Sequence, residues 1–173
     1  MRNSPPVETE RFLTFEAESA LYALPIAEVH EVAEVSRVCC VPTCSPARVR
    51  VMNWHGDALP VVSAPLLLGP GDPASAAEVD ADEVFQPVPD EKSCDDASVV
   101  GGAHVLVVSS RDDEPAQLGM PIDRVIGLAD GPRQPRGVGG LVVEKRPMGG
   151  CSVSVLDPRR LVERATEVIE GAV

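Results

Sequence analysis

Aromatic side chains are scarce in this chain of 173 residues, since phenylalanine, tyrosine and tryptophan make up only 3 % of it. Apolar residues still reach 44 %, which is enough for a core filled by aliphatic side chains and alanine. No run of about 18 consecutive apolar residues is present, which argues against a transmembrane helix. The N-terminal sequence MRNSPPVETERF lacks the apolar segment of a secretory signal. We therefore expect a cytoplasmic protein with no direct membrane insertion.

Basic charge is also in short supply, because 15 Lys and Arg face 27 Asp and Glu, a net charge of −12. No basic patch interleaved with aromatic residues is present, so we expect no nucleic-acid partner. The stretch from Pro70 to Ser98 alone carries nine acidic residues and one lysine, a net charge of −8. It has few large apolar groups to offset its ordering entropy. We predict a flexible N-terminus over 1–10 and one domain over 11–170, with a mobile acidic loop over 70–98.

The five cysteines form no disulfide framework, because their number is odd and the expected compartment is reducing. Cys39, Cys40 and Cys44, with His30 or His55, offer the thiolate and imidazole ligands that zinc prefers. Adjacent cysteines rarely reach one tetrahedral ion, however, and no second pair stands at ligand spacing. We therefore expect no metal and no cofactor, and keep a small cysteine-based metal-binding protein as the alternative.

Catalytic residues could be sought in Ser63 with His55 and Asp57, or in Cys151 with His104. Neither set has the spacing of a known nucleophile site, and the G-x-S-x-G motif is absent. The glycine clusters fit no phosphate-binding fingerprint and are better explained as turns. We therefore expect a protein that is not an enzyme.

Turn-forming residues are abundant, with 14 glycines and 17 prolines, and they predict short strands rather than long helices. The clearest unit is a β-hairpin over Val49–Gly69, whose turn lies at Asn53–Asp57. Pro60 cannot donate a hydrogen bond within a sheet, so the second strand of this hairpin should lie at an edge or bulge. Leu66–Gly69 should close the unit as a short apolar turn.

Other elements follow from local patterns. Asp157 is a suitable N-cap, Pro158 fits the first helical position and Gly171 fits the end of a C-terminal helix. A connecting loop is expected over Val38–Val49. A helical turn should follow Pro25, and the remaining expected strands are Arg11–Glu18, Leu21–Ile26, a segment from Val29, His104–Ser109, Leu141–Glu144 and Cys151–Leu156.

Three ordered blocks resemble the CheW family of chemotaxis adaptors, and together they span about Phe12 to Ala165. The first runs from Phe15 through Tyr22 to Val32, the second is the hairpin, and the third resembles the family's G-L-x-V-D-x-V-x-x-V signature. The resemblance implies a mostly β, CheW-like fold of two small five-stranded SH3-like barrels with a C-terminal helix and a hydrophobic groove between the barrels. The matching residues are Phe15, Tyr22, Ala23, Leu24, Pro25, Ile26, Val29, Glu31, Val32, Val41, Pro42, Asn53, Gly56, Pro60, Val61, Gly69, Gly119, Ile122, Asp123, Val125 and Leu128.

The same resemblance implies a non-enzymatic scaffold in a bacterial chemosensory array, with two partners. One is the signalling tip of a methyl-accepting chemoreceptor, a helical hairpin that an apolar groove would receive. The other is the regulatory domain of a CheA-type histidine kinase. By resemblance, the receptor-binding residues are Val29, Glu31, Val32, Gly119, Ile122 and Asp123. The kinase-binding residues are Arg50, Asn53, Trp54, His55 and Gly56.

Four departures from the family pattern cluster at the hairpin. Arg50 replaces a glycine, Trp54 a leucine, His55 an arginine and Ser63 an aspartate. The resemblance implies that Glu31 lies near the turn arginine, whose position His55 occupies here. Arginine is always charged and grips a carboxylate with two hydrogen bonds, whereas histidine does neither near neutral pH, so a pair of His55 with Glu31 should be weaker. A divergent adaptor of the FrzB kind, bound to receptors but not coupled to the kinase, is therefore an alternative. A scaffold for another signalling or motility pathway is a third hypothesis.

Overall fold

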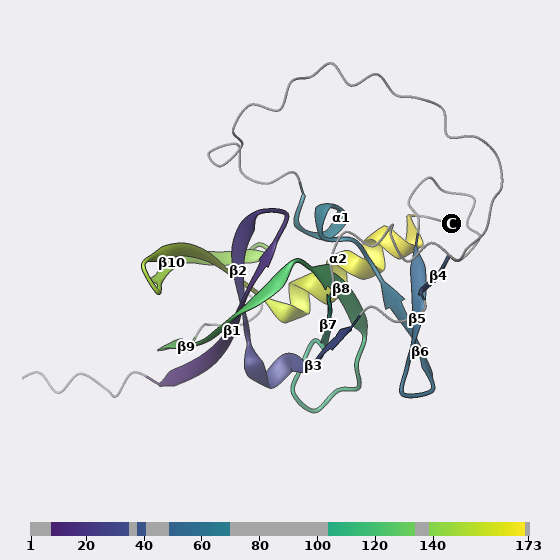
Figure 1. The fold of residues 1–173 in the computed structure, drawn as a ribbon, viewed down its shortest axis with the longest axis horizontal. Helices are drawn as coiled ribbons and strands as arrows, with labels where there is room; N and C mark the ends of the chain where they lie inside the picture. Colours follow the sequence, from purple (N-terminus) through teal and green to yellow (C-terminus); the bar gives the residue numbers. More distant parts are fainter. Residues whose placement is uncertain (1–7, 35–37, 41–48, 70–103, 134–138, 172–173) are drawn as a thin grey trace, which may run out of the picture.

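The computed structural model describes residues 8–34, 38–40, 49–69, 104–133 and 139–171, and its elements are shown in Figure 1. The acidic segment 70–98 and most of the segment 1–10 lie outside the described residues, so the expectations for them stay predictions. In chain order the elements are β1 (Thr9–Ala17), β2 (Ala20–Pro25), the 3-10 helix η1 (Ile26–Glu28), β3 (Val29–Glu34), β4 (Val38–Cys40), β5 (Arg50–Trp54), β6 (Asp57–Val61), α1 (Ala64–Leu68), β7 (His104–Val108), β8 (Leu118–Ile122), β9 (Arg124–Pro132), β10 (Val142–Met148), β11 (Cys151–Leu156) and α2 (Pro158–Glu170).

The strands form two sheets, with α2 running across the middle of the molecule (Figure 1). The first sheet has five strands in the order β10-β11-β2-β1-β9, and the second has six in the order β3-β7-β8-β6-β5-β4. The predicted mostly β, two-sheet architecture with a C-terminal helix is confirmed. The sixth strand is a difference, because Val38–Cys40, expected to be loop, pairs antiparallel with β5. Three residues are too few for a periodic pattern to reveal them.

The first hairpin forms as the sequence predicts. β1 and β2 pair antiparallel, with Phe15 opposite Tyr22, and their rings stack with centroids 6.0 Å apart. The reversal uses Glu18 and Ser19, both at positive φ (50° and 61°), one residue earlier than expected. The helical turn after Pro25 and the strand beginning at Val29 are both confirmed.

The central hairpin is confirmed, but the expected position of its second strand is wrong. β6 is not an edge strand, since it lies between β5 and β8. Pro60 is tolerated because the parallel pairing of β6 with β8 consists of one position, Val61 opposite Gly119. At Pro60 the strand is therefore paired on one side only, with Val51 of β5.

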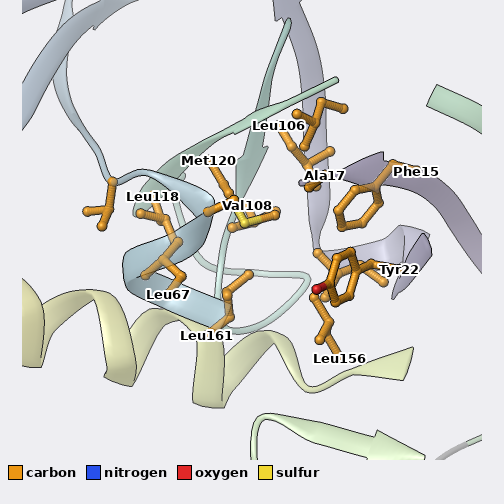
Figure 2. Close-up of a cluster of buried hydrophobic side chains, with 14 of the residues drawn as sticks. Phe15, Ala17, Tyr22, Leu67, Leu106, Val108, Leu118, Met120, Leu156 and Leu161 are labelled. Atoms are coloured by element: carbon orange, nitrogen blue, oxygen red, sulfur yellow. The ribbon is translucent and has the colours of Figure 1, made fainter. Parts of the chain in front are cut away.

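The main core is formed by side chains of both sheets and packs against α1 and α2 (Figure 2). The apolar strand β7 packs on both of its faces. Leu106 and Val108 face the main core, while Val105 and Val107 face a second cluster within the six-stranded sheet. Side chains at alternate strand positions point to opposite faces, so both faces of β7 are buried. The labelled core residues of Figure 2 are Phe15, Ala17, Tyr22, Leu67, Leu106, Val108, Leu118, Met120, Leu156 and Leu161.

The C-terminal helix begins where the sequence predicts. The carboxylate of Asp157, itself buried, accepts hydrogen bonds from the backbone N–H groups of Arg159 and Arg160. Leu161 and Ala165 face the main core from one side of the helix. With 13 residues α2 is short, and no helix within the described ranges is both long and apolar enough to cross a membrane.

Candidate functional site

The tip of the central hairpin is a two-residue turn at His55 and Gly56. Both residues have positive φ, 51° and 99°, as a tight reversal between twisted strands requires. Glycine adopts this backbone freely, and histidine is among the residues that tolerate it. The side chain of Asn53 accepts a hydrogen bond of 2.9 Å from the backbone N–H of Gly56, which holds the turn. Asn53, His55 and Gly56 are exposed, so three of the five predicted kinase-binding residues lie together at the surface.

Side-chain nitrogens of Trp54 and His55 both face the carboxylate of Glu31 on β3. The indole Nε1–H of Trp54 donates to Oε2 of Glu31 over 3.0 Å, and Nε2 of His55 lies 3.0 Å from the same oxygen. These contacts, with that to His55 contributing most, lower the pKa of the Glu31 carboxyl below its usual value. We call Glu31, Trp54 and His55 the tip cluster. Glu31, predicted to bind the receptor, is therefore joined to residues predicted to bind the kinase.

The tip cluster links two strands that are not neighbours in their sheet. β3 is one edge of the six-stranded order, and β5 stands next to the other edge. A second imidazole, that of His30, meets the Trp54 ring edge-on with centroids 5.9 Å apart, and His55 meets the same ring at 4.8 Å. Arg50 begins β5 opposite Val61, four residues and about 13 Å of strand from the tip. The structure does not bring Arg50 into the cluster.

The predicted receptor-binding residues do not form one surface. Val29 and Val32 are half-buried and pack against the main core, and Asp123 is exposed. Gly119 and Ile122 are buried, and Ile122 is 0 % exposed. The side chain of Ile122 lies in the main core, and its assignment to the receptor contact stays a prediction.

Three of the six large apolar residues that are exposed within the described ranges lie on β9, which the sequence interpretation did not single out as a binding surface. Val125, Ile126 and Leu128 are 39, 50 and 55 % exposed. Within the described residues β9 is an edge of its sheet and pairs only with β1, and a register shift of that pairing lies between Thr14 and Phe15. We call Val125, Ile126 and Leu128 the β9 strip.

An open pocket of about 200 Å³ adjoins the β9 strip. Ile126 and Leu128 line it from β9, while Met148 and Val153 line it from β10 and β11. The β9 strip and this pocket together place apolar side chains from three strands at one part of the surface. The sequence of the β9 strip, R-V-I-G-L-A, is equally typical of a buried strand, so only the position of β9 at the sheet edge reveals it.

The residues considered for catalysis are spread over the fold. Cys151 begins β11 in the five-stranded sheet, whereas His104 begins β7 in the six-stranded sheet. Ser63 precedes α1, and His55 is engaged with Glu31. Among described residues, no group of three or more His, Cys, Asp or Glu could hold a metal ion. Cys44 and the side chains of Cys39 and Cys40 lie outside the description, so the expectation about metal there stays a prediction.

Comparison with known proteins agrees with this architecture. The model of the CheW-like domain family matches residues 11–165. Among solved structures, the chain is similar to the crystal structure of the scaffolding protein TtCheW from Thermoanaerobacter tengcongensis, with a TM-score of 0.58 and 16 % identity over 89 % of this chain and 92 % of that chain. At this identity the likeness concerns the fold alone, and curated protein sequences give no match. Since the family model covers most of its length, the chain belongs to the CheW-like family of chemotaxis scaffolds.

Proposed function

We propose that this protein is a non-enzymatic adaptor of a chemosensory array, which binds a chemoreceptor signalling tip and the regulatory domain of a CheA-type histidine kinase. The observation that carries the proposal is the presence of two separate specialised surfaces on a CheW-like chain: the apolar β9 strip and the polar tip cluster. A scaffold needs such a pair, because each partner must keep its own site while the other is bound. It would act in the cytoplasm, recruited to receptor arrays.

The β9 strip is the proposed contact for the receptor tip. Val125, Ile126 and Leu128 offer apolar anchors to the face of a helical hairpin. Charged groups stand at one end of the strip, where Arg124 pairs with Glu16 over 2.7 Å. Anchors of this kind supply affinity, and the charges at the rim supply orientation. Asp123, from the original prediction, is exposed beside them.

The hairpin tip is the proposed contact for the kinase. Tryptophan is enriched among the residues that dominate binding energy at interfaces, and Trp54 is held in place by its hydrogen bond to Glu31. The alternative is an adaptor that binds receptors without coupling to the kinase. It is favoured by His55, since the half-exposed Glu31 here meets an imidazole rather than a bidentate guanidinium.

Titration of the full chain against each partner tests the proposal. Leu128→Ser should weaken binding of a receptor-tip fragment by about tenfold or more, because an exposed anchor contributes over 1 kcal/mol when it is central, and should leave kinase binding unchanged. Trp54→Ala should do the reverse. Val142→Ser is the matched control, since Val142 is a 41 % exposed aliphatic residue of β10.

Binding of the receptor fragment alone would establish the uncoupled alternative. Binding of neither fragment, with an unchanged circular dichroism spectrum, would contradict the proposed function while leaving the fold as described. Equal losses for Leu128→Ser and Val142→Ser would remove the β9 strip as the receptor site.

A further inference from the structure

The tip cluster holds the carboxylate of Glu31 through two side chains, and only one of them, His55, can change its protonation state. The indole N–H of Trp54 is a donor at every pH, whereas an imidazole changes its charge within pH 5 to 8. Both donors meet the same carboxylate oxygen, Oε2 of Glu31, at 3.0 Å. The strength of one half of this bridge must therefore depend on pH.

We propose that the tip cluster is a pH-responsive contact, in which protonation of His55 tightens the attachment of the hairpin tip to β3. The inference concerns the free chain and does not need the kinase to be the partner of this surface. It goes beyond the adaptor function because it gives the surface two states within the physiological pH range.

Proton placement explains the direction of the effect. A neutral imidazole has one N–H group, and the contact with Glu31 is favourable only when that proton sits on Nε2. The other tautomer turns a lone pair toward the carboxylate. The imidazolium form has N–H groups on both nitrogens and adds charge to the hydrogen bond, which makes it shorter and stronger. Lower pH within the range should therefore favour the bridged tip.

Glu31 is held toward its charged form. The hydrogen bond with His55 first, and then that with Trp54, lowers the pKa of its carboxyl below the usual value. Two further ionisable groups of the described residues lie near the tip. His30 of β3 meets the Trp54 ring edge-on, and Asp57 stands opposite Trp54 at the start of β6. Glu34 ends the same strand as Glu31.

The contact has a structural consequence because of what it joins. β3 is paired on one side by β7, with a register shift between Val29 and Glu31. Through the tip cluster its other side is tied to the β5–β6 hairpin, which is not its neighbour in the sheet. Weakening the His55 contact removes one of the two links between the hairpin tip and β3 and leaves the hydrogen bond from Trp54 to Glu31 in place.

Nuclear magnetic resonance of the full chain tests the proposal, because the sequence has only three histidines and one tryptophan. The imidazole titrations of the wild type, of Glu31→Gln and of Glu34→Gln would be followed from pH 8 to pH 5, with the Trp54 indole N–H as a second signal. We expect the protonation constant of His55 to fall two- to fivefold in Glu31→Gln, roughly the size of an exposed ion pair. The control Glu34→Gln should leave it within the measurement error.

The indole N–H resonance in the wild type should follow the His55 titration, and in His30→Gln it should keep that midpoint. An unchanged His55 titration in Glu31→Gln would overturn the proposal. So would an indole resonance that follows His30 and loses its pH dependence in His30→Gln, because the titration would then report ring contact rather than the bridge.

Discussion

Gly119→Ala tests whether this residue belongs to the core, as the structure places it, or to a partner surface, as the family resemblance suggested. A Cβ atom at this position would lie 2.9 Å from Cγ1 of Val105 and 3.1 Å from Cγ2 of Val61. Both neighbours belong to the second core cluster and are themselves buried, so neither can move far. Gly119 stands opposite Val107 on β7 and Val61 on β6, which hold its backbone from both sides.

The cost of the added methyl group is an overpacking penalty. Such insertions typically cost about 1–3 kcal/mol, and the reduced freedom of the unfolded chain returns about 0.4–1 kcal/mol. We therefore expect a net loss of about 1–2 kcal/mol in the free energy of unfolding. In a chain of this size the loss lowers the melting temperature by roughly 2–8 °C.

Urea unfolding followed by circular dichroism measures this change, with Gly140→Ala as the control. A Cβ at the exposed Gly140 meets nothing within 4 Å, so its effect should stay within about 0.5 kcal/mol. If Gly119→Ala were as stable as the control and instead lost receptor binding, the packing argument would be refuted and the original assignment restored.

Three further predictions concern stability. Asp157→Ala should cost about 1 kcal/mol in urea unfolding because it removes the cap of α2, and Asp157→Asn should cost less. Leu161→Ala should cost about 2–5 kcal/mol, since Leu161 is fully buried in the main core; a smaller loss would mean that α2 is not part of the core. Because the folded-state pKa of Glu31 is lowered, its carboxylate stabilises the chain above its usual titration range. The stability difference between wild type and Glu31→Gln should accordingly shrink as pH falls from 5 to 3, and a difference that stays constant over this range would contradict the pKa shift.

Much of the fold could be predicted because its local signals agree. Asp157, Pro158 and Gly171 stand at the two ends of α2, where the sequence suggested, and Asp157 caps the first turn. The helical turn after Pro25 and the strand from Val29 were likewise predictable from proline and a change of period. The prediction that Pro60 marks an edge strand was wrong, although at Pro60 itself β6 is indeed paired on one side only. A strand that contains proline can lie inside a sheet when the next strand pairs with it at another residue.

The site was less predictable because exposure depends on tertiary position. The apolar run from Val125 to Leu128 is typical of a buried strand, and only its place at the edge of the sheet exposes it. Conversely, Ile122 belongs to a signature associated with binding and is nevertheless core. The contact of Glu31 with Trp54 and His55 joins residues more than 20 positions apart, so no local pattern reveals it. Only the family resemblance placed Glu31 near the turn position of His55.

Simultaneous binding is the central claim of the adaptor proposal, and sedimentation velocity tests it most directly. The full chain would be mixed with a receptor-tip fragment, with a CheA regulatory domain, and with both. Because the β9 strip and the tip cluster lie on different sheets, we expect a ternary complex that sediments faster than either binary complex. Competition between the two partners, with only binary complexes at saturation, would contradict the account.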